Sequence, residues 1–362
     1  MKRTCLLLIF ICLVSAPSFA RKKPVQPSER AVFHNNQGVT YLNQGQFERA
    51  EFEFKTAAEL SPDYAKVDDA IKMIKKAIKK DPVFSDAYYN LGLRYLEKTK
   101  QNPAKSYIKF AEAEFKKATE LNPTLKLVHT ELAKMYRELG DFEHAVIRYR
   151  LALEDYPNDV DAWLKLGNLY LEMKEPFKAQ NTFLKAVEIN PDSAEAHQQL
   201  GMFYYNEGRF EEALTELEEV ARLQPISELA YYRVGTVKLN IGDAKKQTGD
   251  AASADVYYDA AKAAFQHSLE INPNFADASF NLGLVYLKQG NNEEARRQWE
   301  HTLILDPKHG RTLYNIGTLY NYIGNKKASL EKLCLFLRLG IKDYATEAET
   351  ARKITESHGG CP

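Results

Sequence analysis

The chain has 362 residues, of which 27% are charged and 44% are hydrophobic. Its 49 basic side chains are matched by 49 acidic ones, so it lacks the net positive charge that holds nucleic acid through counterion release. We therefore expect no nucleic-acid partner.

The first twenty residues differ in character from the rest of the chain. Two basic residues precede an apolar run over residues 6–14, and a segment of small residues then ends at Ala20. This order is typical of a secretory signal peptide. We expect residues 1–20 to be removed, residues 21–30 to form an N-terminal linker, and the protein to be periplasmic or secreted.

Three other interpretations of this segment are weaker. Cleavage after Ala16 would leave Pro17 beside the cut. A membrane anchor needs about 20 apolar residues, and since no run in the chain is that long, no transmembrane segment is expected. Lipid attachment at Cys12 is disfavoured by the bulky Phe10 and Ile11 before it.

A repeat follows the linker and extends over most of the chain. Pro157, Pro191 and Pro225 follow Pro123 at intervals of 34 residues. Each proline closes a segment with the same order of small and aromatic residues. In the clearest segment these residues are Trp163, Leu166, Gly167, Tyr170, Ala179, Phe183, Ala186 and Pro191. Such spacing predicts two antiparallel helices that pack through small residues.

This pattern resembles the tetratricopeptide repeat. The resemblance covers residues 31–339 and implies an all-α protein, an α-solenoid in which helix pairs stack into a right-handed superhelix. It indicates about eight repeats, one of them a half repeat at 64–82. The full segments are 31–62, 85–123, 126–157, 160–191, 194–225, 228–273, 276–307 and 310–339.

The half repeat matches only the second helix of a pair. We therefore expect a lone helix over residues 64–80, and the stacking direction is expected to change there. A polar capping helix over residues 344–357 should end the array, within a C-terminal region at 340–362.

Two segments are longer than the others. Seven extra residues lie near 97–110 and fourteen near 239–258, which correspond to about two and four helical turns. Divided evenly, they would lengthen both helices without rotating the packed faces. We expect protruding hairpins with Pro103 and residues 242–249 at their tips, and the alternative is a solvated loop without function.

Neither catalysis nor a cofactor is indicated. The repeated glycines allow helix backbones to approach closely, and none belongs to a phosphate-binding loop. His34, His129 and His197 occupy a repeat position that normally holds a buried aromatic residue, so they are interpreted as core residues and no metal site is expected. No catalytic triad or metal-protease motif is present, so we expect no enzyme.

By resemblance, the first helix of each repeat lines a concave groove. Amide side chains donate and accept hydrogen bonds at once, which suits an extended peptide backbone, and aromatic rings offer anchor surfaces. Two positions before the repeated glycine the chain has Asn36, Asn90, Gln199, Arg233, Asn281 and Asn315. One position earlier it has Tyr89, Tyr232, Phe280 and Tyr314. These ten residues are the predicted peptide-binding set; alternatively, the amides bridge helices and the aromatic rings pack within the array.

The kind of ligand is constrained by one departure from the family. Chaperone-binding relatives grip two carboxylates with lysines that Leu164 and Leu229 replace here, although Asn168 and Arg233 remain. An acidic C-terminal tail is therefore a poor candidate ligand.

Cleavage after Ala20 would also leave only two of the four cysteines, Cys334 and Cys361. In an oxidising compartment these two can form a disulfide, which we predict. The alternative is a buried Cys334 and a frayed tail. The loss of Lys2 and Arg3 would leave 47 basic and 49 acidic side chains, so the exported chain is nearly neutral.

The resemblance implies a non-catalytic scaffold of the bacterial cell envelope that binds protein partners through its groove. Several exported bacterial relatives help to assemble pili, secretion channels or envelope enzymes. The alternative is an accessory protein that binds peptidoglycan or another glycan, with the aromatic residues of the groove stacking on sugars.

Overall fold

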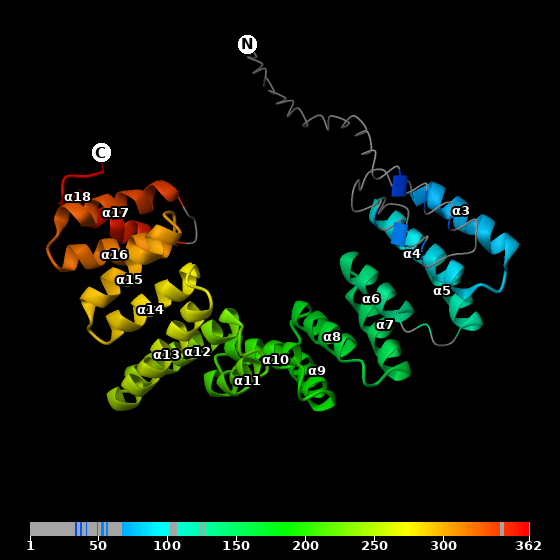
Figure 1. Ribbon diagram of the computed structural model, residues 1–362, viewed down its shortest axis with the longest axis horizontal. Helices are drawn as coiled ribbons and strands as arrows, with labels where there is room; N and C mark the ends of the chain where they lie inside the picture. Colours follow the sequence, from blue (N-terminus) through cyan, green and yellow to red (C-terminus); the bar gives the residue numbers. More distant parts are fainter. Residues whose placement is uncertain are drawn as a thin grey trace, which may run out of the picture. The chain divides into compact units, whose positions relative to one another are not determined.

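The computed structural model describes residues 67–101, 107–122, 125, 127–340 and 344–361, together with eight single positions between residues 33 and 56. These residues form helices, and no strand occurs among them. The chain divides into two compact units, Met1–Arg148 and Tyr149–Pro362 (Figure 1). The predicted all-α class is confirmed.

The first unit holds three complete helices after the half repeat's helix. In chain order its described helices are α3 (Val67–Lys80), α4 (Ser85–Gln101), α5 (Ile108–Leu121) and α6 (Val128–Glu138). The division between the units falls within α7 (Phe142–Asp155).

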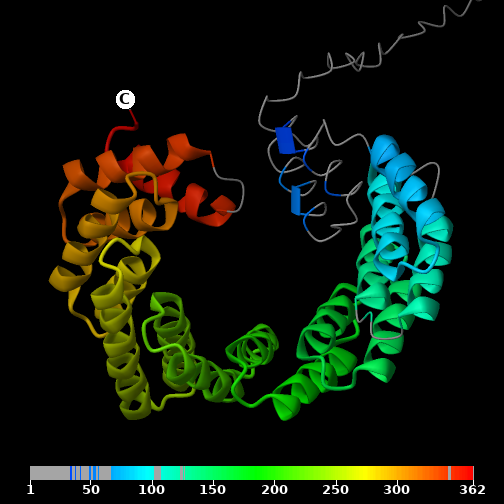
Figure 2. The same cartoon turned by 45° about the vertical axis from the view of Figure 1, so that its right-hand side comes forward.

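After the end of α7, the described residues of the second unit form five helix pairs and a terminal helix (Figure 2). The pairs are α8 (Val160–Glu172) with α9 (Pro176–Ile189), α10 (Ala194–Asn206) with α11 (Phe210–Leu223), α12 (Glu228–Gln247) with α13 (Ala251–Ile271), α14 (Ala276–Lys288) with α15 (Asn292–Leu305), and α16 (Gly310–Tyr322) with α17 (Lys326–Leu339). The terminal helix is α18 (Ala345–Ser357).

Each pair is held together by a glycine that faces an aromatic or leucine side chain. A Cβ atom on Gly167 would lie 2.4 Å from Cε1 of Phe183, and one on Gly283 would lie 2.4 Å from Nε1 of Trp299. Phe183 and Trp299 are fully buried. The pattern of small and aromatic residues therefore creates the close approach between the two helices of a pair, as the spacing predicts.

The fourteen-residue insertion lengthens both helices of the pair α12 and α13, to 20 and 21 residues. It adds one heptad to each, because Gly242 faces Tyr258 just as Gly235, seven residues earlier, faces Phe265. Even division of this insertion is therefore confirmed. The turn lies at Gly249, with φ of 86°, whereas Gly242 lies inside α12 and not at the tip as predicted.

The seven-residue insertion behaves differently. Helix α4 has 17 residues, but its partner α5 has 14, the length found in the regular repeats. Even division is therefore wrong here, because only the first helix is lengthened. The predicted tip at Pro103 lies outside the described residues.

The helix of the half repeat is observed from Val67 to Lys80. It buries Ile71 and Ile74 in the same apolar cluster as Leu91 of α4. The predicted change of stacking direction involves residues 64–66, which lie outside the described part, and stays a prediction.

The array ends at α18, which packs on α17 and α16. Ala351 is fully buried in this contact. Beyond the helix, the sulfur atoms of Cys334 and Cys361 are bonded, with their Cα atoms 5.5 Å apart. The tail is thereby fastened to α17.

Candidate functional site

The predicted peptide-binding residues lie on the first helices of the pairs. Asn36 is outside the described residues. The others lie on α4 (Tyr89, Asn90), α10 (Gln199), α12 (Tyr232, Arg233), α14 (Phe280, Asn281) and α16 (Tyr314, Asn315). Within the second unit α12 and α14 contact each other, so the residues that they carry come together.

Phe280 is not an accessible anchor, which corrects the prediction. Its side chain is 2% exposed, and its ring centroid lies 6.4 Å from that of Trp299 and 5.1 Å from that of His309. The guanidinium carbon of Arg311 lies 4.8 Å from the same centroid and covers the ring. Phe280 is therefore part of the core between two repeats.

Asn281 is similarly enclosed. It is 6% exposed, too little for its amide to lie open along a groove, so its predicted role in reading a ligand backbone is also corrected. Burial and the nearby Asp277 carboxylate raise the pKa of the Tyr232 hydroxyl. A hydrogen bond with the Asn281 side chain acts in the opposite direction and lowers this pKa. Asn281 thus bridges two neighbouring first helices.

The three tyrosines of the predicted set are half-buried and pack on rings of their own repeat or the next. The ring centroids of Tyr89 and Phe115 lie 5.5 Å apart, and those of Tyr314 and Phe336 also lie 5.5 Å apart. Tyr232 lies 4.9 Å from Phe275. Each tyrosine therefore has one face within the array and leaves part of its ring accessible.

A charged cluster covers Phe280 and was missed by the sequence reasoning. The Asp277 carboxylate lies 3.1 Å from the Arg311 guanidinium and 3.3 Å from Nε2 of His309. Hydrogen bonding from His309, followed by the charge of Arg311, holds the pKa of Asp277 below its ordinary value. The available signal was the 34-residue separation of Asp277 and Arg311, which puts opposite charges at the same position of adjacent repeats.

Two of the predicted residues, Arg233 and Asn90, carry polar groups that have no partner within the described part of the chain. Arg233 is half-buried, burial lowers the pKa of its guanidinium, and no ion pair with it occurs among the described residues. In the first unit, the Oδ1 atom of Asn90 is buried and accepts no hydrogen bond within the described part of the chain. Gln199 and Asn315 are half-buried as well. A ligand could satisfy the groups left open.

His197 occupies the core, as its repeat position predicts. Its side chain is 8% exposed, with Nδ1 2.7 Å from Glu216 and Nε2 2.8 Å from the carbonyl oxygen of Pro191. Over the described ranges, no three His, Cys, Asp or Glu side chains are grouped to hold a metal ion. None of the described helices combines the length and apolar character needed to cross a membrane.

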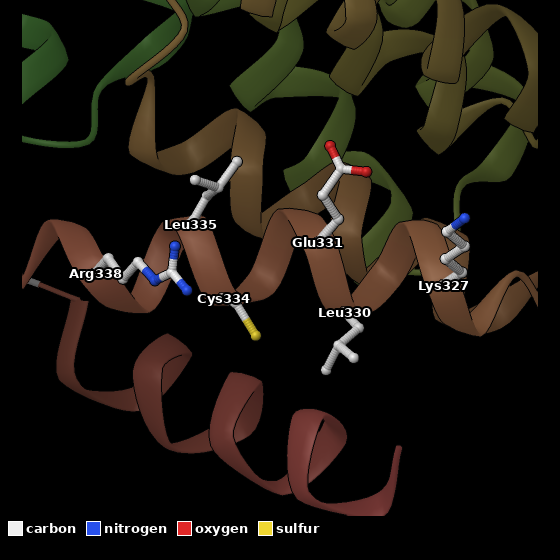
Figure 3. A pocket seen from close by; sticks show the side chains of 6 residues that line it. All are labelled: Lys327, Leu330, Glu331, Cys334, Leu335 and Arg338. Atoms are coloured by element: carbon white, nitrogen blue, oxygen red, sulfur yellow. The ribbon is translucent and has the colours of Figure 1, made fainter. Parts of the chain in front are cut away.

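A hollow of about 310 Å³ lies on α17, next to the disulfide. It is lined by Lys327, Leu330, Glu331, Cys334, Leu335 and Arg338. Figure 3 shows Leu330 and Cys334 on the α18 side of the helix and Glu331 and Leu335 on the opposite side. None of the predicted peptide-binding residues contributes to this hollow.

Models of known protein families match several segments of the chain. Family models described as "Tetratricopeptide repeat" match residues 31–64, 160–193, 182–215 and 264–297, and one described as "TPR repeat" matches 133–174. The antiviral innate immune response effector IFIT1 of Macaca fascicularis is 30% identical over 106 residues, which cover 25% of this chain and 22% of IFIT1. The chain therefore spans about a fifth of that relative.

Two solved structures are also similar. A crystal structure of MamA is 27% identical, with a TM-score of 0.41, and the match covers 49% of this chain and 96% of MamA. The type IV pilus biogenesis factor PilW is 23% identical, with a TM-score of 0.46 and coverage of 63% and 98%.

Proposed function

We propose that this chain, a tetratricopeptide repeat protein, is a non-catalytic scaffold that binds an extended peptide segment of a protein partner along the first helices of its second unit. Arg233 is the observation that carries this proposal. Its half-buried guanidinium has lost part of its hydration without gaining an ion pair among the described residues. A carboxylate or carbonyl oxygen of a ligand would restore those hydrogen bonds.

The surroundings of Arg233 indicate the character of the segment. Tyr232 precedes it on α12 and offers an aromatic edge, and Asp277 and Arg311 supply a charge pair whose side chains are both 45% exposed. Side chains of both signs favour a peptide over a purely anionic ligand. We infer a segment with an internal acidic residue opposite Arg233, flanked by an apolar side chain that contacts Tyr232.

The structure revises how the predicted set would act. Tyr232 and Tyr314 are the accessible rings, and Gln199 and Asn315 are the amides that can meet a backbone. Asn281 and Phe280 are buried, so they would hold these residues in place and would not contact the ligand. Asn90 and Tyr89 belong to the first unit and would serve a separate stretch of ligand.

A display selection tests the proposal. Random peptides are selected on the immobilised chain, and the affinity of the enriched peptide is then compared between Arg233→Gln and Lys238→Gln. Lys238 is the matched control, since it lies on the same helix but pairs with Glu218. We expect enriched peptides to contain Asp or Glu and Arg233→Gln to weaken them at least tenfold, as loss of a buried interface anchor does.

Equal affinities for the two variants would contradict the assignment to Arg233. Failure to enrich any peptide, combined with retention of the chain on purified cell-wall sacculi, would instead favour the glycan-binding alternative.

We further propose that the scaffold acts in the bacterial cell envelope, after export and removal of residues 1–20, in the assembly of pili, secretion channels or envelope enzymes. The twenty N-terminal residues and the Cys334–Cys361 disulfide support this location. Expression with the native N-terminus should yield a periplasmic or secreted protein that begins at Arg21 and contains no free thiol by mass spectrometry. An uncleaved cytoplasmic product would contradict it.

A further inference from the structure

Two aromatic rings at the start of α5, next to the seven-residue insertion of the first unit, lie outside the packing between α4 and α5. Packing of α5 on α4 uses Ala111, Phe115 and Ala118, all of which are fully buried. Phe110, in contrast, is 56% exposed, and Tyr107, which precedes the helix, is half-buried. These two rings are therefore additional to the repeat core.

The rings form one cluster rooted in the core by Tyr95 of α4, which is 7% exposed. The centroid of Phe110 lies 5.4 Å from that of Tyr95 and 6.0 Å from that of Tyr107. Tyr95 and Tyr107 stack at 6.4 Å. The exposed Phe110 is thus held in place by two neighbouring rings and is not a loose surface residue.

Lysines from two helices surround this cluster. Nζ of Lys98 lies 4.8 Å from the ring centroid of Tyr107, and Nζ of Lys75 lies 5.6 Å from that of Tyr95. Lys109, beside Phe110, is exposed. Over residues 72–117 the chain has eleven lysines and one arginine against five acidic residues. The region is strongly basic although the whole chain is neutral.

We propose that this aromatic–lysine surface, made of Lys75, Lys98, Tyr107 and Phe110, binds the anionic phospholipid surface of a membrane. The proposal is independent of the peptide site in the second unit. The chain would dock peripherally, with Phe110 entering the headgroup region and the ammonium groups meeting lipid phosphates.

The choice of lysine over arginine favours a bilayer over an acidic protein. Arginine forms fixed paired hydrogen bonds with carboxylates and is enriched at protein interfaces, where lysine is depleted. The single arginine of the segment, Arg94, already pairs with Glu97 at 2.7 Å. Lysines act as mobile point charges, which suits lipid headgroups that diffuse in a plane, and an exposed aromatic ring beside them suits the interface.

Vesicle co-sedimentation tests this proposal, using the chain from Arg21 onward, which retains every described residue. The probes are phosphatidylcholine vesicles with and without about 30% phosphatidylglycerol. The test variant combines Phe110→Ser with Lys98→Glu. The matched control combines Phe177→Ser with Lys178→Glu on α9, where Phe177 is 82% exposed and Nζ of Lys178 lies 5.5 Å from the Tyr170 ring.

We expect the parent chain and the control variant to bind anionic vesicles, and the test variant to bind at least tenfold more weakly. Neutral vesicles should capture little of any form, and about 0.5 M salt should release the parent, because the attraction is screened. Melting curves followed by circular dichroism should coincide for the two double variants, which separates lost binding from lost folding.

Three results would overturn the proposal. The parent chain could fail to bind anionic vesicles, it could bind neutral vesicles equally well, or both double variants could lose binding to the same extent. Binding to polyglutamate with the expected variant dependence, but not to vesicles, would assign the surface to an acidic protein and also refute a lipid surface.

Discussion

The two lengthened hairpins respond to their extra residues in opposite ways. In the pair α12 and α13 the insertion is absorbed into the packing, and the added Tyr258 is fully buried against Gly242. In the pair α4 and α5 only the first helix grows, and Phe110, which lies at the start of the regular-length α5, is 56% exposed. Only the longer insertion adds an aromatic ring to the core between its two helices.

The difference follows from the helical period. Fourteen residues provide one heptad for each helix, and a heptad is close to two turns, so the packed face continues without rotation. Seven residues provide only one heptad for two helices, so at most one of them can continue. The partner α5 then begins at Ile108, as in a regular repeat, and the lengthened end of α4 buries Thr99, whose hydroxyl accepts a hydrogen bond from the backbone N–H of Tyr107.

The largest expected contrast comes from removing one ring in each hairpin. Tyr258→Ala should lower the free energy of unfolding by about 3 to 5 kcal/mol, because a fully buried ring leaves a cavity. Phe110→Ala should lower it by less than about 1 kcal/mol, as expected for a half-exposed side chain. Urea unfolding followed by circular dichroism would measure both. Similar losses would mean that Phe110 is part of a core and would break the comparison.

A second experiment examines the contact that absorbs the longer insertion. Gly242→Ala should cost about 1 to 3 kcal/mol, since the new Cβ atom would lie 2.7 Å from Cε1 of Tyr258. In the Tyr258→Ala background the same substitution should be nearly neutral, because the clashing ring is absent. A double-mutant cycle in unfolding free energy checks this coupling, and additive effects would place the strain elsewhere.

The hydroxyl of Tyr258 allows a finer comparison. It donates a hydrogen bond of 2.7 Å to Asp243, which Lys288 of α14 also contacts at 2.9 Å. Tyr258→Phe should therefore cost about 1 kcal/mol. Tyr107→Phe, in the shorter hairpin, should change the unfolding free energy by less than about 0.5 kcal/mol. The melting temperatures of both variants measure this difference. Equal decreases in melting temperature would contradict a specific role for the hydrogen bonds between Tyr258, Asp243 and Lys288.

The smallest effects concern two carboxyl groups with opposite pKa shifts. Burial, opposed by the charge of Lys75, raises the pKa of Glu114 on α5, whereas hydrogen bonding from His309 lowers the pKa of Asp277 in the second unit. An ionised Glu114 therefore destabilises the fold as pH rises through its raised pKa. Asp277 stabilises it above the ordinary aspartate range near pH 4 and loses this effect as pH falls through its lowered pKa.

At pH 7, Glu114→Gln should raise the unfolding free energy and Asp277→Asn should lower it, each by about 0.5 kcal/mol after allowance for solvent screening. The difference for Glu114 should shrink as pH falls through the raised pKa of that group, and the difference for Asp277 should shrink at lower pH, as pH falls through its lowered pKa. Unfolding curves across this pH range would measure the effects, and two shifts of the same sign would contradict the assignment.

The helix pairs could be predicted from the sequence because the responsible contacts are local. Gly167 and Phe183 are separated by a single turn and lie in one repeat, so their spacing already brings them together. Gly235 likewise faces Phe265 across a longer hairpin. A heptad on each helix changes the length of the pair without changing which residues face one another.

The sequence located the candidate site on the first helices, but it did not predict which of its side chains are accessible. Spacing placed Phe280 and Asn281 on a first helix, and it could not show that His309 and Arg311 would cover them from the next repeat. Whether Phe280 is covered depends on side chains about thirty residues away in the sequence. The repeat pattern does not determine the rotamers of those side chains. Local periodicity was therefore sufficient for the helices and their pairing, whereas the exposed surface depends on packing between repeats.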